Sequence, residues 1–549
     1  MKIGVAQITV DPGDVKGNLE KIISNISQLQ GNSDLIIFPE LTLSGYGHMD
    51  LAYSQEFIED QKKALIDLCS QVQHCPSVII VGFIDSIKDQ KRPNNKDVLY
   101  NSVAVIYKGE IIAIRDKTLL PSYDIFYEER YFSEGSRTGV VEVAGFKLGI
   151  GICEDLWDEG YNKKVYPKLI EEGAEILINV SASPYNINKI QERKKKIESI
   201  VCLNSVPFVY VNLIGSFDGY DGEVVFDGRS LVYNKSGKLI YQAKSFEEES
   251  LIIDLNLDNE SKIENLEKPA EIYEAIVLGI KEYFRRNGFK RAYIGLSGGI
   301  DSAVVAALAV EALGKENIFG VTMPSHITSS ETKNDALNIA ENLGILCKIR
   351  PIVDLYNQWL AKFKQEYERD PDNLTKQNIQ ARLRGLLLMQ ETNEDRSSIV
   401  ISTGNKTELA LGFCTIYGDM CGGFAPISDL DKLTVYELAN FINEKRNKLI
   451  IPQTTIDREP TAELEKDQTD AKNLPAEYKI LSPLVTDIVD NELTKKELYK
   501  KYDQKIVEAT KKLIKVNEFK RRQASPGIRI TGKSFGIGRR FPMVYRGDY

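Results

Sequence analysis

The stretch AYIGLSGGIDSAVVAAL, residues 292–308, constrains the fold more than any other part of the chain. An apolar run ends at Leu296, a turn rich in glycine and serine follows, and an apolar helical pattern begins at once. A strand that passes directly into a helix is the repeating unit of a parallel sheet covered by helices. Strand and helix patterns keep alternating as far as SIVISTG at 398–404. The second half is therefore predicted to be a doubly wound parallel sheet.

The first 255 residues follow a different pattern, with short β-branched runs such as KIGVAQITV, SVIIVGF and EILINVSAS. Helical patterns separate some of these runs, and AVIYKGEIIAI indicates a hairpin around Lys108 and Gly109. This pattern predicts mixed sheets covered by helices. The polar stretch from 254 to 268 has no core pattern. We therefore expect one domain over 1–255, a linker over 256–267 and a second domain over 268–549.

Composition narrows the functional classes. The chain has 549 residues, too many for one core, with 42% hydrophobic residues and a formal net charge of −9. That charge gives no reason to expect a nucleic-acid partner, and no apolar run reaches the ~18 residues of a membrane helix. Seven cysteines without a C-x-x-C pair argue against a zinc site or a disulfide framework. A cytoplasmic location is expected.

The turn after Leu296 has the chemistry of an anion site. Two adjacent glycines, Gly298 and Gly299, let the backbone approach an anion, and the start of the following helix offers N–H groups to phosphate oxygens. The turn has no lysine, so a metal ion would have to neutralise the charge, and Asp301 is a candidate ligand. Glu408, in the first turn of another predicted helix, could share that ion. An ordinary βα turn and a helix-start glutamate are the alternative interpretations.

A second glycine-rich string, GIRITGKS at 527–534, fits the phosphate-loop template letter for letter. The template requires a helix after the loop, but FGIGRRFP does not have a helical pattern. The string lies in a basic tail, 511–549, that has eleven Lys or Arg and two acidic residues. We interpret it as part of that tail and not as a nucleotide site.

Three polar residues in the first half each follow an apolar run: Glu40 after DLIIFP, Lys117 after IIAIRD and Cys153 after KLGIGI. A carboxylate can remove the thiol proton, and a lysine can stabilise the oxyanion formed when the thiolate attacks an amide carbon. Taken singly, each has an ordinary explanation, because cysteine is often a small core residue and Lys and Glu usually face solvent. As a set they predict an amide-cleaving thiol site.

The flanking sequences of this set resemble the nitrilase superfamily with its Glu-Lys-Cys catalytic set. The resemblance implies an α-β-β-α sandwich and adds Glu128 of YEERYF as a further active-site residue. Similarity to the glutaminase members implies that glutamine is bound by Tyr123, Glu154, Ser183 and Lys189.

The second half resembles the NAD synthetases. The turn SGGIDS is similar to the pyrophosphatase loop of ATP enzymes that release AMP, and QNIQARLRG, YGDMCGGFAPISDLDK and NEFKRRQASPG follow in the expected order. The resemblance implies that ATP is contacted by Gly295, Leu296, Ser297, Gly298, Gly299, Ile300, Asp301, Ser302, Thr403, Lys432 and Thr461. It implies Mg²⁺ on Asp301 and Glu408, and deamido-NAD among Asn378, Arg382, Arg384, Glu408, Asp419 and Lys520. Ile416 stands where the ammonia-using relatives typically have lysine.

Together the two halves resemble the glutamine-dependent NAD synthetases. The resemblance implies that deamido-NAD, ATP and glutamine give NAD, AMP, pyrophosphate and glutamate, in a homo-oligomer of at least two chains. One alternative is an amidase whose second half only senses a nucleotide. A tRNA-modifying adenylating enzyme is the other; it would need a basic face and a pair of reactive cysteines in the second half.

Overall fold

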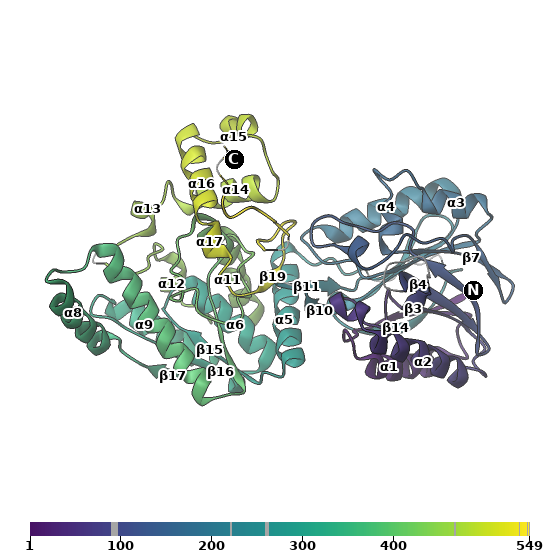
Figure 1. The fold of residues 1–549 in the computed structure, drawn as a ribbon, viewed down its shortest axis with the longest axis horizontal. Coiled ribbons are helices and arrows are strands. Elements are labelled where there is room, and N and C mark those ends of the chain that lie inside the picture. Colours follow the sequence, from purple (N-terminus) through teal and green to yellow (C-terminus); the bar gives the residue numbers. More distant parts are fainter. Residues whose placement is uncertain are drawn as a thin grey trace. The chain divides into compact units, whose positions relative to one another are not determined.

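The computed structural model describes residues 1–88, 97–219, 222–257, 263–465, 468–536, 538–545 and 547. The chain divides into two compact units, which Figure 1 shows in purple to blue and in teal to yellow. Unit 1 consists of Met1–Phe217 and Val225–Leu266, and unit 2 of Asp218–Val224 and Glu267–Tyr549. Part of the expected linker, residues 258–262, and Asp548 of the basic tail lie outside the described residues. No described helix is both long and apolar enough to cross a membrane.

Unit 1 contains two six-stranded sheets. The first has the order β14-β1-β2-β3-β4-β5, with bounds β1 (Lys2–Gln7), β2 (Leu35–Ile37), β3 (Val78–Ile87), β4 (Val98–Tyr107), β5 (Glu110–Asp116) and β14 (Glu249–Asp254). The second has the order β13-β12-β9-β8-β7-β6, with bounds β6 (Val141–Val143), β7 (Phe146–Ile152), β8 (Ile176–Ser181), β9 (Phe208–Asn212), β12 (Leu231–Tyr233) and β13 (Leu239–Gln242).

Parallel strands form the centre of both sheets, and antiparallel strands flank them. Strands β1, β2 and β3 are parallel, as are β7, β8 and β9. The predicted hairpin joins β4 to β5 in antiparallel register. Lys108 and Gly109, at its turn, have φ angles of 51° and 81°. Two successive positive φ values match the twist of a two-residue hairpin turn, so the prediction is confirmed.

Helices cover the outer faces of the two sheets (Figure 1). Helices α1 (Val15–Leu29) and α2 (Gln55–Gln71) pack on the first sheet, and α3 (Val165–Glu171) and α4 (Lys189–Asn204) pack on the second. One hydrophobic core joins the two inner faces, for example through Val5 of β1 and Val209 of β9. The expected α-β-β-α sandwich is confirmed.

Unit 2 is built on a four-stranded, fully parallel sheet of order β17-β16-β15-β18. Its strands are β15 (Arg291–Gly295), β16 (Ile318–Thr322), β17 (Leu346–Ile349) and β18 (Ser398–Ile401). The chain order reverses between β15 and β18, and ligands bind at such a switch point in doubly wound sheets. The predicted fold of the second half is confirmed.

Helices pack on this sheet and continue to the end of the chain. Helix α6, which follows β15, packs on β15 and β16, and α9 packs on β15 and β18. The helices are α5 (Lys268–Asn287), α6 (Ile300–Leu313), α7 (Ser330–Leu343), α8 (Val353–Tyr367), α9 (Asn373–Glu394), α10 (Lys406–Leu411), α11 (Lys432–Arg446), α12 (Gln453–Asp457), α13 (Asp470–Asn473), α14 (Tyr478–Val489), α15 (Lys495–Lys501), α16 (Gln504–Val516) and α17 (Glu518–Arg521).

The string GIRITGKS does not form a phosphate loop. Its first three residues are strand β19 (Gly527–Arg529), which pairs in parallel with β11 (Gly222–Asp227). Strand β10 (Ile214–Asp218) completes this small sheet. The described residues that follow β19, 530–536, contain no helix. The template therefore lacks the helix it requires, as predicted.

Candidate active sites

Cys153 lies at a strained turn directly after β7. It opens a short 3-10 helix, Cys153–Leu156, and is almost completely buried. Its φ angle is 42°, in the left-handed region that non-glycine residues rarely adopt, which costs about 1–3 kcal/mol. Such strain is common where a turn must present a reactive side chain.

Glu40, Lys117 and Glu128 form one buried cluster. The Lys117 ammonium lies 2.7 Å from Glu40 Oε1 and 2.8 Å from Glu128 Oε1. Glu40 Oε1 also accepts from Asn101 Nδ2 at 2.7 Å, and its Oε2 accepts from the Ala182 N–H at 2.8 Å. Ala182 follows β8, the neighbour of β7, the strand that ends just before Cys153. The structure thus brings Glu40 and Lys117, which follow strands of the first sheet, to the carboxyl end of β8 in the second sheet.

Electrostatics link Cys153 to this cluster. Burial raises the pKa of the thiol well above its usual value, Glu40 and Glu128 raise it further, and Lys117 opposes them. Desolvation acts to lower the pKa of Lys117, but Glu128 and Glu40 raise it above its ordinary value. Burial also raises the pKa of Glu128, to about 7. The resting sulfur is therefore a thiol, and it needs a carboxylate as proton acceptor before it can attack.

Two of the predicted glutamine-binding residues are in direct contact. The Tyr123 hydroxyl donates to both carboxylate oxygens of Glu154, each at 3.1 Å, and the Tyr161 hydroxyl donates to Oε1 at 3.1 Å. Burial raises the pKa of Glu154, and Lys117 and Lys189 act against that rise.

The other two predicted glutamine-binding residues have partners of their own. Lys189 Nζ lies 4.0 Å from the centre of the Trp157 ring. The Ser183 hydroxyl accepts from Arg193 Nε at 3.3 Å. Arg193 is fully buried and pairs with Asp227 at 2.8 Å, so this network fixes the backbone around Ser183.

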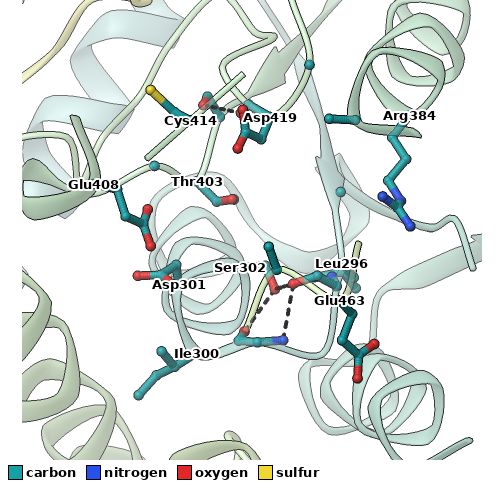
Figure 2. A pocket seen from close by; sticks show the side chains of 18 of the residues that line it. Leu296, Ile300, Asp301, Ser302, Arg384, Thr403, Glu408, Cys414, Asp419 and Glu463 are labelled. Atoms are coloured by element: carbon teal, nitrogen blue, oxygen red, sulfur yellow. Dashed lines mark hydrogen bonds between the residues drawn. The ribbon is translucent and has the colours of Figure 1, made fainter. Parts of the chain in front are cut away.

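A cavity of 310 Å³ lies at the carboxyl ends of β15 and β18, the switch point of the sheet. Every residue assigned to ATP from the resemblance lines it: Gly295, Leu296, Ser297, Gly298, Gly299, Ile300, Asp301, Ser302, Thr403, Lys432 and Thr461. Figure 2 shows Asp301 and Glu408 together on one side of the cavity, while Arg384 projects from the opposite side.

Contacts within the turn after β15 hold it in shape. Gly298 has a φ of 80°, and a Cβ there would lie 2.2 Å from the Thr332 carbonyl oxygen, so only glycine fits. Ser297 Oγ lies 3.2 Å from Ser302 Oγ and accepts from the Gly299 N–H at 3.1 Å. Thr455 and Arg458 donate to the Gly298 carbonyl oxygen. The turn is therefore fixed before any anion binds.

The two candidate metal ligands share a lysine. Lys432 Nζ lies 2.5 Å from Asp301 Oδ2 and 3.2 Å from Glu408 Oε1. The buried Asn405 side chain caps α10: its Oδ1 accepts from the Glu408 N–H, and its Nδ2 donates to Asp301 Oδ1 at 3.0 Å. Burial raises the pKa of Glu408 to about 8, against the attraction of Lys432. The pKa of Lys432 is raised because both carboxylates outweigh its desolvation.

These residues fit a magnesium ion that also binds phosphate. Both carboxylates line the cavity (Figure 2). They already stabilise one cation, the Lys432 ammonium. Mg²⁺ is usually held by one or two carboxylates together with substrate phosphates and water. Among the described residues, no group of three or more His, Cys, Asp or Glu could hold a metal. The carboxylates of Asp301 and Glu408 would therefore need phosphate oxygens of the substrate to complete the coordination of the ion.

The predicted dinucleotide set is divided. Arg384, Glu408 and Asp419 line the cavity. Thr415 donates to Asn378 Oδ1 at 2.9 Å, and the exposed Arg382 donates to the Ile416 carbonyl. Asn378, Arg382 and Lys520 are not part of the cavity lining.

Lys520 and its neighbours hold the end of α10. Lys520 Nζ donates to the carbonyl oxygens of Gly412 at 2.7 Å and Cys414 at 2.8 Å. Asn517 Nδ2 donates to the Leu411 carbonyl oxygen at 2.9 Å. The last carbonyl groups of a helix lack intrahelical partners, so these bonds stabilise the helix that carries Glu408.

A buried lysine ties the start of α10 to the basic tail. Lys406 Nζ lies 2.9 Å from Asp429 Oδ1 and 2.8 Å from Asp490 Oδ2. It also donates to Thr531 Oγ1 at 2.7 Å and to the Lys533 carbonyl at 2.9 Å. Thr531 and Lys533 belong to the GIRITGKS string. This string therefore holds the helix of Glu408 by its backbone and hydroxyl groups.

Sequence reasoning missed several residues at these sites. Asn405 could have been found, because Asn followed three residues later by Glu is a capping-box pattern. Asn101 and Arg458 gave no local signal, because their partners in the sites are distant in sequence.

Comparisons with known proteins assign each of the two units to a protein family. Residues 2–264 match the carbon-nitrogen hydrolase family and residues 272–524 the NAD synthase family. The glutamine-dependent NAD(+) synthetase of Thermotoga maritima is 36% identical, and the match covers 100% of this chain and 99% of the relative. The chain belongs to the glutamine-dependent NAD(+) synthetases. The Aquifex aeolicus synthetase of that name is 37% identical, with 99% of each chain covered.

Solved structures of glutamine-dependent NAD(+) synthetases share the fold. The Acinetobacter baumannii synthetase, solved in complex with ADP, superposes with a TM-score of 0.77 at 33% identity, covering 99% of this chain and 98% of that one. The Cytophaga hutchinsonii synthetase has a TM-score of 0.83 at 22% identity. The second comparison bears on the fold alone.

Proposed function

We propose that the chain is a glutamine-dependent NAD synthetase that forms NAD from deamido-NAD, with ATP as energy source and glutamine as nitrogen donor. The observation that carries the proposal is the presence of two different sites in one chain. One is a strained cysteine beside a buried Glu-Lys-Glu cluster, and the other is a cavity at a phosphate-binding turn. Residues 1–255 would be the glutaminase domain, 256–267 a linker and 268–549 the synthetase domain.

In the glutaminase domain, Glu40 takes the proton of the Cys153 thiol, and the thiolate attacks the side-chain amide carbon of glutamine. The Lys117 ammonium stabilises the oxyanion of the tetrahedral intermediate. Glu40 returns the proton to the leaving nitrogen, ammonia departs, and water hydrolyses the thioester to glutamate. Glu128 accepts a hydrogen bond from Lys117 and so keeps the Lys117 ammonium charged. Tyr123, Glu154, Ser183 and Lys189 bind the amino acid.

In the synthetase domain, a nicotinate carboxylate oxygen of deamido-NAD attacks the α-phosphorus of ATP, and pyrophosphate leaves. The N–H groups of the turn after β15 and of the start of α6 hold that pyrophosphate. Ammonia then attacks the acyl carbon and AMP departs. Adenylation is needed because AMP is a far better leaving group than hydroxide. Arg384 and Asp419 would contact deamido-NAD within the cavity.

Mg²⁺ on Asp301 and Glu408 would neutralise charge on the phosphates when it is bound. Lys432 holds the two carboxylates together and keeps them from repelling each other. Homo-oligomerisation and a cytoplasmic location remain part of the proposal.

The deciding experiment is a product assay with deamido-NAD, ATP, Mg²⁺ and glutamine labelled with ¹⁵N in its side-chain amide. We expect NAD that contains one ¹⁵N, with equal amounts of AMP, pyrophosphate and glutamate, all measured by mass spectrometry. An amidase with a nucleotide-sensing module would release ammonia without forming AMP, and that outcome would refute the proposal.

A further inference from the structure

Asp155 is a buried carboxylate that the proposed chemistry does not use. Its side chain accepts three backbone hydrogen bonds and is 1% exposed. Oδ1 accepts from the N–H groups of Thr118 at 3.0 Å and Leu119 at 2.9 Å, and Oδ2 accepts from the N–H of Ile152 at 3.0 Å. Neither Thr118 nor Leu119 is near Asp155 in the sequence, so this arrangement is built by the tertiary fold.

The three donors flank the two residues on which the thiol chemistry depends. Thr118 and Leu119 follow Lys117 directly, and Ile152 precedes Cys153. One carboxylate thus joins the segment that carries the oxyanion-stabilising lysine to the turn that carries the nucleophile. Ile152 is the N-cap residue of the 3-10 helix that begins at Cys153, so its bond to Asp155 also ties the start of that helix. The strained φ of Cys153 is therefore maintained from its own helix.

We propose that Asp155 is a positioning residue that sets Cys153 and Lys117 relative to each other for glutamine hydrolysis. The inference rests on the proposed glutaminase function and adds to it a residue that does not touch substrate. A misplacement of about 1 Å in a catalytic constellation can cost roughly 10²-fold in rate. A link between the two segments therefore has a large effect on turnover and little effect on glutamine binding, which involves other side chains.

Asp155→Asn is a suitable test because it keeps the size of the side chain. An amide has one acceptor oxygen, and its other end is an NH₂ donor. Whichever way the amide is turned, at least one backbone N–H faces a donor in place of an oxygen. Asp155→Glu keeps the charge but moves both oxygens by one methylene. The two variants separate the loss of an acceptor from the loss of position.

We expect the glutamine-dependent kcat of Asp155→Asn to fall by about 30-fold or more, with the KM for glutamine within about threefold. Asp155→Glu should lose about 10-fold or more. NAD formation from ammonium chloride should stay within about twofold in both, because it bypasses Cys153. The rate at which iodoacetamide alkylates Cys153 should also change. A glutamine-dependent kcat within threefold of the parent in both variants overturns the proposal.

Asn234→Ala is the matched control for a purely structural role. Asn234 is a buried residue of unit 1 whose Oδ1 accepts from the N–H groups of Ser236 at 3.1 Å and Lys238 at 3.0 Å. Neither donor adjoins a proposed catalytic residue. We expect this variant to lose stability, measured by thermal unfolding, without losing glutamine-dependent kcat. If its kcat falls as far as that of Asp155→Asn, the effect of Asp155 is general destabilisation and the proposal is wrong.

NAD formation by the unsubstituted protein distinguishes a failure of this inference from a failure of the proposed function. If the parent forms no NAD from glutamine but does so from ammonium, the glutaminase assignment fails. If it uses glutamine and both Asp155 variants do so equally well, the glutaminase assignment stands and only the positioning role is refuted.

Discussion

The two sites contain the same arrangement of charges in different surroundings. In unit 1, Lys117 bridges Glu40 and Glu128, and the three side chains are at most 8% exposed. In unit 2, Lys432 bridges Asp301 and Glu408, whose side chains are 17% and 19% exposed and line a cavity. In a buried trio of this kind each charge must have a partner, because an unpaired buried charge is very costly. A partly exposed trio can exchange its cation.

This difference matches the chemistry proposed for each site. Removing a proton from a thiol needs a base whose neighbours do not move, and the buried trio provides a fixed, desolvated base. Binding a metal–phosphate complex needs carboxylates that an incoming cation can reach. Lys406 with Asp429 and Asp490 is a third trio of this type, almost fully buried, and its role is to join α10 to the tail.

The largest expected effect separates the two sites completely. Cys153→Ala removes the nucleophile, so glutamine-dependent NAD formation should fall by about 10⁴-fold or more. Ammonium-dependent formation should stay within about twofold, because ammonia enters the second reaction directly. Steady-state assays with each nitrogen source would measure both rates. If ammonium chloride fails to rescue the variant, the two reactions are not divided between the units as proposed.

Asp301→Ala should have the reverse pattern, failing with both nitrogen sources. Loss of one of two carboxylates at a phosphate site should reduce AMP formation by about 10²–10³-fold. Hydrolysis of glutamine by Cys153 should still be detectable as glutamate release. Full turnover of Asp301→Ala at ordinary Mg²⁺ would show that this carboxylate is not a metal ligand.

A pair of substitutions tests the role of burial in the comparison. Lys117→Met leaves two buried carboxylates unpaired and should cost about 3–5 kcal/mol of local stability. Lys432→Met leaves two carboxylates that line a cavity, where water and cations can reach them, and should cost less than Lys117→Met, about 1–2 kcal/mol. Hydrogen exchange of the peptides around each lysine, read by mass spectrometry, gives both values. Equal costs would contradict the distinction between a sealed and an open site.

The last prediction concerns pH. Desolvation raises the pKa of Asp155 to about 7 from an ordinary 3.8, although Lys117 and three backbone N–H groups lower it. The folded state therefore keeps this proton longer than the unfolded state, so the contribution of Asp155 to stability is largest below pH 4. It is lost as pH rises to 7, by as much as about 4 kcal/mol.

The stability of the parent minus that of Asp155→Asn should therefore decrease between pH 4 and pH 7, as measured by urea unfolding at several pH values. The ratio of their glutamine-dependent kcat values should increase over the upper part of this range, because only the ionised carboxylate offers an acceptor to every N–H group. A stability difference that does not change with pH would place the pKa of Asp155 near its ordinary value.

Much of this architecture could be read from the sequence, because the signals were local. The strand, turn and helix at 291–313 follow from apolar pattern and glycine, and the hairpin at Lys108 and Gly109 follows from turn chemistry. Glu40, Lys117 and Cys153 could be grouped because each follows an apolar strand pattern, although the sequence did not show that Cys153 follows a strand of a different sheet. The ligands that each residue binds remain predictions.

The rest could not be read, because it depends on contacts that no local pattern encodes. Lys520 was expected to face the dinucleotide, and it also donates to two carbonyl groups beyond α10. Asp155 has no local signature beside Cys153, because two of its three backbone N–H partners are more than thirty positions away. Backbone groups carry no identity in a sequence, so a side chain that binds only backbone gives no motif.

The junction of Lys406 with Thr531 and Lys533 has a consequence for the order of events during synthesis. The last two contacts at the start of the helix that carries Glu408 cannot form until residue 533 has left the ribosome. The side chains of the thiol turn, Cys153–Leu156, take their hydrogen bonds from residues that precede 183, so the turn needs none of those late residues. A nascent chain truncated before residue 531 would therefore be able to form the thiol turn but would lack the tail contacts that hold the helix of Glu408.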